Sequence, residues 1–249
     1  MIVVATLLCD RKKSSQLVGI PAASQLEGDI RLYVNIECPH GGDQFKEEYA
    51  PLMNFIQSES PVMVDTDVWR WDSTWRQSPQ HDQDQRRLHP IVIARNMARA
   101  YMLDQGASHI LFVDADVIVR PDGLQKLLSL DRPLCGGFVP GRGAHSHVWY
   151  VFGDPKPVEG HPNVIECVHG TCGYMLVRRD LMSTLAFRAG LSREDMQTPL
   201  SEDPAFCSDA FVNGFGRFWI HRDAIAQHWD DPKNPFTGNQ ASDDYDIPV

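Results

Sequence analysis

The sequence feature that most restricts the fold is Ile110–Val113, a run of four consecutive apolar residues. A strand that is apolar at every position is typical of a sheet covered on both faces. The stretch before it, Ile91–Leu103, places its apolar residues at helical spacing, with Pro90 suited to its first turn and Gly106 after its end. A helix leading into such a strand predicts a parallel α/β sheet with helices on its faces.

Other apolar runs extend this pattern along the chain. We expect an α/β, Rossmann-like fold with a mainly parallel central sheet and a mixed second half. In the first half the other predicted strands are Ile2–Leu8, Arg31–Ile36 and Val62–Val64, and a short helix is predicted over Pro121–Leu130. In the second half the predicted strands are Leu134–Phe138, Val148–Phe152, Val164–Val168, Arg217–Ile220 and Ala224–His228, and the predicted helices are Arg179–Phe187 and Asp203–Gly214.

The composition is that of an ordinary globular chain. Apolar residues make up 43% and charged residues 22% of the 249 residues, which excludes a collagenous, coiled-coil or mostly disordered protein. The 23 basic and 33 acidic residues give a net charge of −10. An acidic chain is a poor general ligand for nucleic acids or anionic membranes, although it is compatible with a local basic patch.

Length and cysteine usage bear on domain organisation and location. We expect one domain over residues 1–231, followed by a flexible tail or lid at 232–249, where three prolines and few apolar residues occur. No run of about 18 apolar residues occurs, so no membrane span is predicted. The six cysteines form no CxxC pair, which favours reduced thiols and a cytoplasmic protein.

Two carboxylates, Asp114 and Asp116, follow the apolar strand directly. In an extended chain such side chains lie on the same side, at the strand end where α/β sheets bind ligands. Adjacent anions there are unfavourable unless a cation neutralises them, and Mg²⁺ and Mn²⁺ take oxygen ligands. Alternatively, one aspartate caps the next helix and the other is solvated, although Pro121 and Asp122 lie closer to that helix. The pair predicts a divalent metal site that substrate phosphates complete.

Several short motifs occur in a defined order from the first predicted strand to the end of the last. They are Ala94-Arg95-Asn96, Gly106, Asp114-Ala115-Asp116, Gly170-Thr171-Cys172-Gly173, Arg178-Arg179, Glu202-Asp203-Pro204-Ala205-Phe206 and His228. In this order the chain resembles a GT-A glycosyltransferase of the family 2 type. The resemblance implies a GT-A fold with a nucleotide-sugar-binding half at 1–120 and an acceptor and catalytic half at 121–231. The motifs point to the superfamily more than to a particular donor or acceptor.

The resemblance implies a metal site for the donor diphosphate. Asp114 and Asp116 would hold Mn²⁺ or Mg²⁺ against the diphosphate of a nucleotide sugar, with a UDP-sugar favoured. His228 matches the late metal-ligand histidine of the family, and imidazole suits Mn²⁺ better than Mg²⁺. Without the motif order, His228 reads equally well as a hydrogen-bonded histidine beside Trp229.

The resemblance also implies a catalytic base. Asp203 matches the aspartate that takes the acceptor proton in inverting enzymes, and Glu202 is the neighbour that could orient or replace it. The same residues also make a good helix start, with Ser201 as cap and two acids in the first turn. Retention of configuration stays open, since inversion is implied only through Asp203.

Nucleotide-binding residues of the family lie near the ends of the first strands. By position these are Leu8, Cys9 and Asp10 after the first strand and Asn35 or Glu37 after the second. Asp67, after the third strand, could accept a hydrogen bond from a uracil N–H, or could be a turn residue. Arg95 could contact the diphosphate, or could be a surface charge of its helix. The donor-binding set is therefore Asp10, Asn35, Asp67, Arg95 and Asp114.

The acceptor is less restricted by the sequence. Candidates are a glycan or other saccharide, a small molecule, a protein hydroxyl, or a hydroxymethylated base in DNA. Residues 69–89 match no feature of the family and carry Trp69, Trp71 and Trp75 among arginines, typical of an acceptor platform or of a tryptophan cluster that anchors the loop. From 69 to 99 there are six Arg and three Asp, which is compatible with nucleic acid. His145, His147 and Trp149 fall in the half where the family builds its acceptor site. A His-x-His pair can bind metal, but a solvated loop is expected here. Oligomeric state stays open.

Two other functions fit parts of the pattern. A haloacid-dehalogenase-type phosphatase also uses Asp-x-Asp after a strand, but that motif usually opens its domain, and only Lys126, Lys156 and Lys233 follow Asp116. A non-catalytic nucleotide- or carbohydrate-binding module on the same fold is the other alternative. A degenerate copy would be expected to have lost one of Asp114, Asp116, Asp203 and His228.

Overall fold

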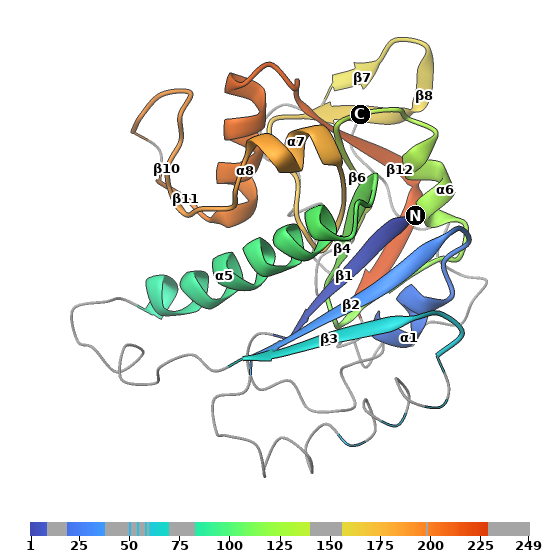
Figure 1. Cartoon of the computed structure of the whole chain (residues 1–249). Coiled ribbons are helices and arrows are strands. Elements are labelled where there is room, and N and C mark those ends of the chain that lie inside the picture. Colours follow the sequence, from blue (N-terminus) through green and yellow to red (C-terminus); the bar gives the residue numbers. More distant parts are fainter. Residues whose placement is uncertain are drawn as a thin grey trace.

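The computed structural model describes residues 1–8, 19–37, 60–69, 83–139, 156–197 and 199–228, together with residues 50, 54 and 58. These residues form an α/β fold around one mixed sheet of ten strands (Figure 1). The strands of this sheet are β1 (Ile2–Leu8), β2 (Ile30–Glu37), β3 (Val64–Trp69), β4 (His109–Val113), β5 (Val117–Val119), β6 (Leu134–Phe138), β7 (Lys156–Val158), β8 (His161–Cys167), β9 (Tyr174–Arg178) and β12 (Phe218–His228). The helices are α1 (Gly19–Ser24), α5 (Gln83–Asp104), α6 (Gly123–Leu128), α7 (Arg179–Thr184) and α8 (Glu202–Val212), and a small hairpin joins β10 (Gly190–Leu191) to β11 (Pro199–Leu200).

The first half of the sheet is parallel, in the order β3-β2-β1-β4. The fully apolar strand predicted at Ile110–Val113 is confirmed as β4, and all four of those residues are buried. Because these strands run in the same direction, their carboxyl ends meet at one edge of the sheet. The predicted α/β class is confirmed.

The second half of the sheet is mixed, as predicted. Strand β9 runs antiparallel to both of its neighbours, β4 and β6, and therefore joins the two halves. Strand β12 is parallel to β6 and antiparallel to β5 and β8. Tyr174, the first residue of β9, pairs with Val113, the last residue of β4. The turn that precedes β9 consequently meets the turn that follows β4.

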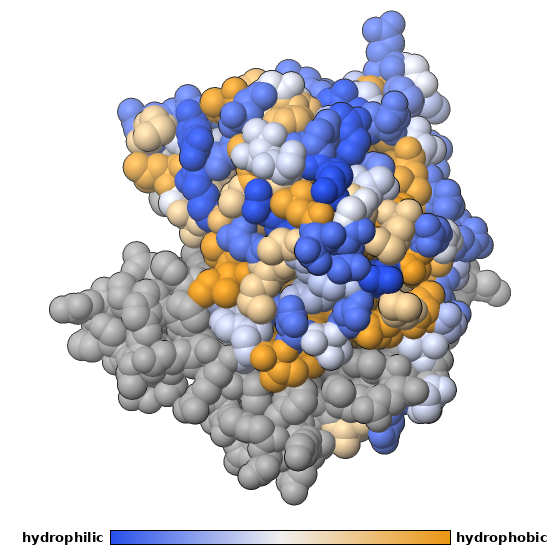
Figure 2. Space-filling model, in the orientation of Figure 1, coloured by the Kyte–Doolittle hydropathy of each residue, from blue (hydrophilic) through white to orange (hydrophobic). Residues whose placement is uncertain are grey.

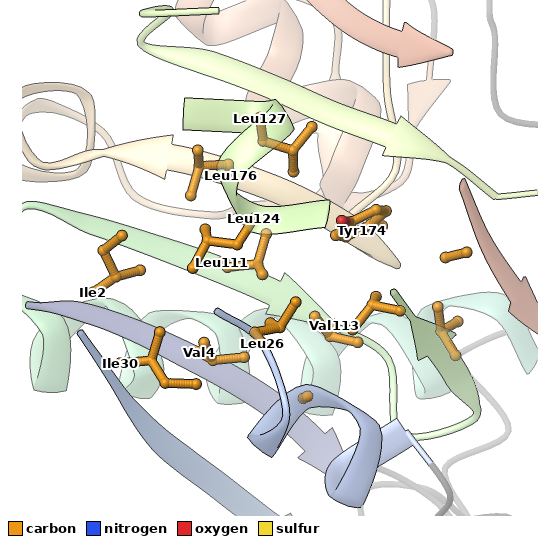
Figure 3. Close-up of a cluster of buried hydrophobic side chains, with 14 of the residues drawn as sticks. Ile2, Val4, Leu26, Ile30, Leu111, Val113, Leu124, Leu127, Tyr174 and Leu176 are labelled. Carbon is orange, nitrogen blue, oxygen red and sulfur yellow. The ribbon is translucent and has the colours of Figure 1, made fainter. Parts of the chain in front are cut away.

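Helices cover both faces of the sheet (Figure 1). On one face, α1 and α6 enclose a core cluster to which Leu111 and Leu124 belong (Figure 3). On the other face, α5, α7 and α8 enclose a second cluster that includes Ala98, Phe112 and Phe206. Successive residues of β4 point to opposite faces, so this strand contributes to both clusters.

Several predicted boundaries are wrong. The third strand is β3, which begins at Val64, so Asp67 lies within the strand and not after it. The helix predicted from Ile91 begins at Gln83, which puts Pro90 inside α5 and moves the end of the 69–89 segment into a helix. The residues at the start of α5 are mostly polar, so apolar periodicity could not reveal them.

Other corrections concern the second half. The two strands predicted at 217–220 and 224–228 form one strand, β12, with a register shift between His221 and Ile225. Strand β9 was not predicted at all. The strand predicted at 148–152 lies outside the described residues.

Two findings bear on the predictions of no membrane span and of reduced cysteines. Among the residues that the structure describes, no helix combines the length and hydropathy needed to cross a membrane. Four of the six cysteines are described, and all four are buried free thiols: Cys135, Cys167, Cys172 and Cys207.

Candidate functional site

The Asp114–Asp116 segment forms a turn at the end of β4. The Asp114 amide donates to the carbonyl oxygen of Gly173 (3.2 Å), and the Val117 amide donates back to the carbonyl of Asp114 (2.9 Å). The chain is therefore not extended here, and strand alternation does not place the two carboxylates, contrary to the prediction. Asp116 is 3% exposed, whereas the side chain of Asp114 is 38% exposed.

The start of α1 closes against this turn. A Cβ atom on Gly19 would lie 2.6 Å from the carbonyl oxygens of Asp114 and Val117 and 2.7 Å from that of Ala115. No side chain fits in that space, so glycine is required by close approach and not by backbone dihedrals. The carbonyls that shape the turn are thereby fixed by a neighbouring helix.

Arg95 of α5 is a buried cation beside Asp114. It is 4% exposed, its Nη2 lies 3.4 Å from Asp114 Oδ1, and its guanidinium carbon lies 5.1 Å from the centre of the Phe112 ring. Burial lowers its pKa, but nearby negative charge, including that of Asp203 and Asp114, outweighs burial and raises it. The Nε and Nη1 atoms are buried and have no hydrogen-bond partner among the described residues, which is unusual for a buried guanidinium.

Asp203 occupies the first turn of α8, with Ser201 at the helix cap position. Its Oδ2 accepts hydrogen bonds from the Thr171 hydroxyl (3.1 Å) and from the Cys172 amide (2.9 Å). Its Oδ1 is buried and makes no hydrogen bond. The interpretation as a helix start is confirmed, and the side chain of Asp203 also contacts the loop that precedes β9.

Glu202 is the second acid of this turn and is only 7% exposed. Burial first, and the negative charge of Asp203 second, raise its pKa to about 8. A carboxyl with such a pKa still carries its proton at neutral pH. Glu202 and Asp203 thus differ in environment although they are adjacent in sequence.

The segment 170–173 joins the two acidic centres. The Gly173 carbonyl accepts from the Asp114 amide, and the Gly173 amide donates to the Thr171 hydroxyl oxygen (3.1 Å). The Thr171 hydroxyl in turn donates to Asp203. A Cβ on Gly173 would lie 3.3 Å from Asp114 Oδ2, which shows how closely this loop approaches that carboxylate.

The predicted metal ligands are close along the backbone. His228 ends β12 and pairs with Val117, the residue after Asp116. The side chain of His228 is outside the described part, and the described residues contain no cluster of three metal-binding side chains. Strand register brings only the backbone of His228 next to the Asp114–Asp116 turn. Carboxylate oxygens and imidazole nitrogens are donor types that Mn²⁺ takes in proteins.

A second polar group lies on β2 and β3. The Tyr33 hydroxyl donates to Asp67 Oδ2 (2.6 Å), and the Asn35 amide donates to the Tyr33 oxygen (3.1 Å). The Asn35 carbonyl oxygen accepts from Trp69 Nε1 (2.6 Å). Burial and the bond to Asp67 raise the pKa of Tyr33, so its hydroxyl stays protonated and donates. Asn35 is fully buried and already bonded through its oxygen and its nitrogen, whereas Asp67 is exposed.

Strand register relates this group to the Asp114 turn. Leu7, Asn35 and Asp67 are paired across β1, β2 and β3, and on the other side of β1 Ala5 pairs with Phe112. Three strand-to-strand steps separate β3 from β4, so at ordinary strand spacing Asp67 and the end of β4 are about 14 Å apart across the sheet. An elongated ligand could reach both.

Some predicted residues are not in the site, or not described. The Arg178-Arg179 pair is structural: Arg178 pairs with Asp180, and Arg179 donates to the carbonyls of Leu103 and Ala107 at the end of α5. The residues that fall outside the described part are Cys9, Asp10, Trp71, Trp75, His145, His147 and Trp149, and the side chain of Glu37.

Comparison with known proteins extends this picture. No protein-family model matches the sequence, and no curated protein matches it. Among solved structures, S. aureus TarS superposes with a TM-score of 0.50 at 13% identity, over 91% of this chain and 36% of TarS. The fold is that of GT-A glycosyltransferases. At this identity the likeness shows the GT-A fold alone, and the chain spans about a third of TarS.

Two other solved structures are similar at lower TM-scores. A197 from STIV reaches 0.49 at 12% identity, over 93% of this chain and 87% of A197. A mycobacterial protein reaches 0.45 at 14% identity, over 93% of this chain and 68% of that one.

Sequence reasoning missed three residues of the site: Gly19, Tyr33 and Thr171. Thr171 lay inside a quoted motif but was given no role, and the glycines on both sides of Thr171-Cys172 were the signal that the backbone passes close to other groups. Tyr33 and Gly19 carried no local signal, because their importance depends on neighbours distant in sequence.

Proposed function

We propose that this protein is a metal-dependent, inverting glycosyltransferase that moves a sugar from a nucleotide sugar, with UDP-sugars favoured, to an acceptor hydroxyl. The observation that carries the proposal is the joining of Asp114 and Asp203 through the 170–173 loop. A diphosphate-binding aspartate and a base must face one reacting centre, and here a short chain of hydrogen bonds links them. The GT-A fold supports the same function.

Asp114, Asp116 and His228 would hold the divalent ion, Mn²⁺ or Mg²⁺. Bound there, the ion would neutralise negative charge on the departing nucleoside diphosphate. Arg95 supports the same end of the donor, since its two unpaired donors and its buried charge suit a phosphate oxygen.

The transfer is a displacement at the anomeric carbon. The acceptor hydroxyl gives its proton to Asp203, and its oxygen forms the new bond to that carbon. The bond to the diphosphate oxygen breaks with its electron pair, so that a nucleoside diphosphate leaves and configuration inverts. Asp203 Oδ1 is the oxygen without a hydrogen-bond partner, so it is the atom suited to receive the proton. Glu202, protonated at neutral pH, adds no second negative charge beside it.

The nucleoside would lie along the edge from Asp114 towards β3. Asp67 is exposed, and Tyr33 holds one of its carboxylate oxygens, so the carboxylate is oriented to accept from a base N–H. Asn35 is assigned a different role from the one first expected, because both ends of its amide already hold Tyr33 and Trp69. Asp10 remains a donor-side candidate by its position after β1.

The acceptor is proposed to be a hydroxyl of a glycan, of a small molecule or of a hydroxymethylated DNA base. Residues 1–120 would form the donor half and residues 121–231 the acceptor and catalytic half of one domain. Figure 2 shows small groups of apolar residues among hydrophilic ones on the described part of this face.

The test combines ligand-induced stabilisation with catalysis. Thermal unfolding is measured with UDP, GDP, CDP and TDP, each with Mn²⁺ and with EDTA. A ligand at 100 times its dissociation constant stabilises the native state by about 2.7 kcal/mol, a readable shift. We expect a Mn²⁺-dependent shift with UDP that is lost in Asp116→Ala and kept in Glu159→Ala, a matched exposed carboxylate. Hydrolysis of the UDP-sugar by water should then depend on Asp203.

The outcomes separate the competing functions. A nucleotide-dependent shift without any hydrolysis or transfer would indicate a binding module. Release of phosphate without a nucleotide-dependent shift in thermal unfolding would indicate a phosphatase. The geometry speaks against the phosphatase, because Lys126, one of the two described lysines after Asp116, is paired with Asp122, and the other, Lys156, lies on β7.

A further inference from the structure

Thr171 has a hydroxyl whose two partners are both fixed by the fold. Its oxygen accepts from the Gly173 amide (3.1 Å), a group that can only donate. Its other partner is Asp203 Oδ2 (3.1 Å), and an ionised carboxylate can only accept. The hydroxyl proton must therefore point to Asp203, and Thr171 is a donor of defined direction.

The Asp203 carboxylate is held on one side only. Oδ2 receives both the Thr171 hydroxyl and the Cys172 amide, whereas Oδ1 receives no hydrogen bond. Two donors on one oxygen fix the rotation of the carboxylate. They also leave the buried Oδ1 as the carboxylate oxygen whose lone pairs no described residue uses.

The same loop contacts the other acidic centre. Gly173 follows Thr171 by two residues, and its carbonyl accepts the amide of Asp114 (3.2 Å). The path Asp114, Gly173, Thr171, Asp203 is therefore a continuous series of hydrogen bonds from the turn after β4 to the start of α8. The loop holds Asp203 by two bonds, one from the Thr171 hydroxyl and one from the Cys172 amide, and of the two donors the Thr171 hydroxyl is the one that belongs to a side chain.

We propose that Thr171 is a positioning residue, which orients the Asp203 carboxylate towards the acceptor and ties this orientation to the Asp114 turn. This inference rests on the proposed function for its catalytic part. Its structural part, the anchoring of Asp203, stands without any transfer reaction. The two parts can therefore be tested separately.

The structural part is tested by amide hydrogen exchange on the full chain, in EDTA and without nucleotide. The Cys172 amide donates to Asp203 Oδ2, so its exchange rate reports whether that carboxylate is held. In Thr171→Val, which removes the hydroxyl and keeps the branched shape, we expect exchange at Cys172 to be about tenfold faster. Thr171→Ser keeps the hydroxyl and should exchange as the wild type does. Unchanged exchange at Cys172 in Thr171→Val would overturn the proposal.

The catalytic part is tested by steady-state kinetics on the same variants. Loss of orientation should lower kcat of Thr171→Val by about 10-fold to 100-fold, with the donor KM changed less than about threefold, and Thr171→Ser should restore kcat. Thr184→Val is the matched control, since Thr184 is exposed and its hydroxyl bonds only the Asp180 carbonyl of α7. A Thr171→Val enzyme with wild-type kcat would overturn the catalytic part. A wild type that transfers no sugar would instead reject the proposed function, while the exchange result would still decide the anchoring.

Discussion

The amide of Gly19 donates a hydrogen bond of 2.9 Å to the carbonyl oxygen of Ala115, at the centre of the turn that follows β4. Helix α1 therefore begins in direct contact with the backbone of the Asp114–Asp116 segment. Since a Cβ atom here would lie within 2.7 Å of three carbonyl oxygens, none of which belongs to a flexible side chain, the contact leaves no room for adjustment.

We expect Gly19→Ala to destabilise the protein by about 1–3 kcal/mol and to displace the Asp114 turn, because overpacking must move backbone here. The measurements are urea unfolding and the Mn²⁺-dependent nucleotide shift, both of which should fall. Gly160→Ala is the control for steric overlap, because no atom lies within 4 Å of a Cβ at that glycine. Its positive φ adds a small backbone strain of its own. Equal nucleotide shifts in the two variants would contradict the assigned role of Gly19.

The buried carboxyl of Glu202 should make stability depend on pH. Its pKa is about 8 in the folded protein against an ordinary value of 4.5, so between these pH values the folded chain keeps a proton that the unfolded chain releases. The folded state therefore binds more protons, and the free energy of unfolding should fall as pH rises from about 4.5 to 8. Glu202→Gln cannot titrate and should lose this slope. The free energy of unfolding of the variant should therefore rise relative to that of the wild type as pH approaches 8.

The measurement for Glu202 is urea unfolding at pH 5, 6, 7 and 8 in EDTA, so that no bound metal alters the local charge. Glu159→Gln, at an exposed glutamate, is the matched control. Parallel pH profiles for the wild type and Glu202→Gln would show that the buried carboxyl does not carry the effect.

Strands with continuous apolar character could be predicted from the sequence, and strands with polar contacts could not. Residues 2–8 and 134–138 were predicted with their observed bounds, because every strand position there is apolar or small. β3 was misplaced because Asp65 and Asp67 interrupt the apolar pattern. Their carboxylates instead accept from Tyr101 and Tyr33, partners that only the folded chain brings near.

The order of the motifs in the sequence was sufficient to name several residues of the candidate site. Asp114, Arg95, Glu202 and Asp203 were named from the sequence, and the fold brings them together. The relation between them was not predictable, because it depends on β9 entering antiparallel beside β4 and placing the 170–173 loop between the two acids. A bond between a side chain and a distant backbone amide, such as the one that Asp203 accepts from Cys172, produces no periodic pattern in the sequence.

Asn35 should stabilise the donor end of the sheet rather than bind the nucleotide directly. We expect Asn35→Ala to cost about 1–3 kcal/mol, because the Tyr33 oxygen loses the donor that it accepts from and the Trp69 indole N–H loses its acceptor. Asn163→Ala, which removes an exposed bond to Asp223, should change stability by less than about 0.5 kcal/mol. Urea unfolding measures both. Equal effects of the two substitutions would show that the Asn35 network is not a stabilising unit.

Arg95 balances the charge of the acidic groups around it, and its removal should be costly in two ways. Arg95→Met keeps much of the side-chain volume but leaves Asp114 beside Asp203 and Glu202 without this cation. Taking one member from a fully buried ion pair costs about 3–5 kcal/mol, and we expect a smaller cost here because the Asp114 side chain is 38% exposed and screened by solvent. Arg95 also lowers the pKa of Glu202, so in Arg95→Met the pH at which stability stops falling should move above that of the wild type.

Arg95→Lys is the matched variant, because it keeps a charge and loses the forked geometry. We expect it to recover most of the stability and the wild-type pH profile. It should not recover the nucleotide-dependent shift, because an ammonium offers all its N–H donors from one nitrogen and cannot reproduce the forked placement of Nε and Nη1. Urea unfolding across pH and thermal unfolding with UDP and Mn²⁺ separate these effects. If Arg95→Lys bound UDP as the wild type does, Arg95 would serve only as a counter-charge, and its assignment to the donor diphosphate would be wrong.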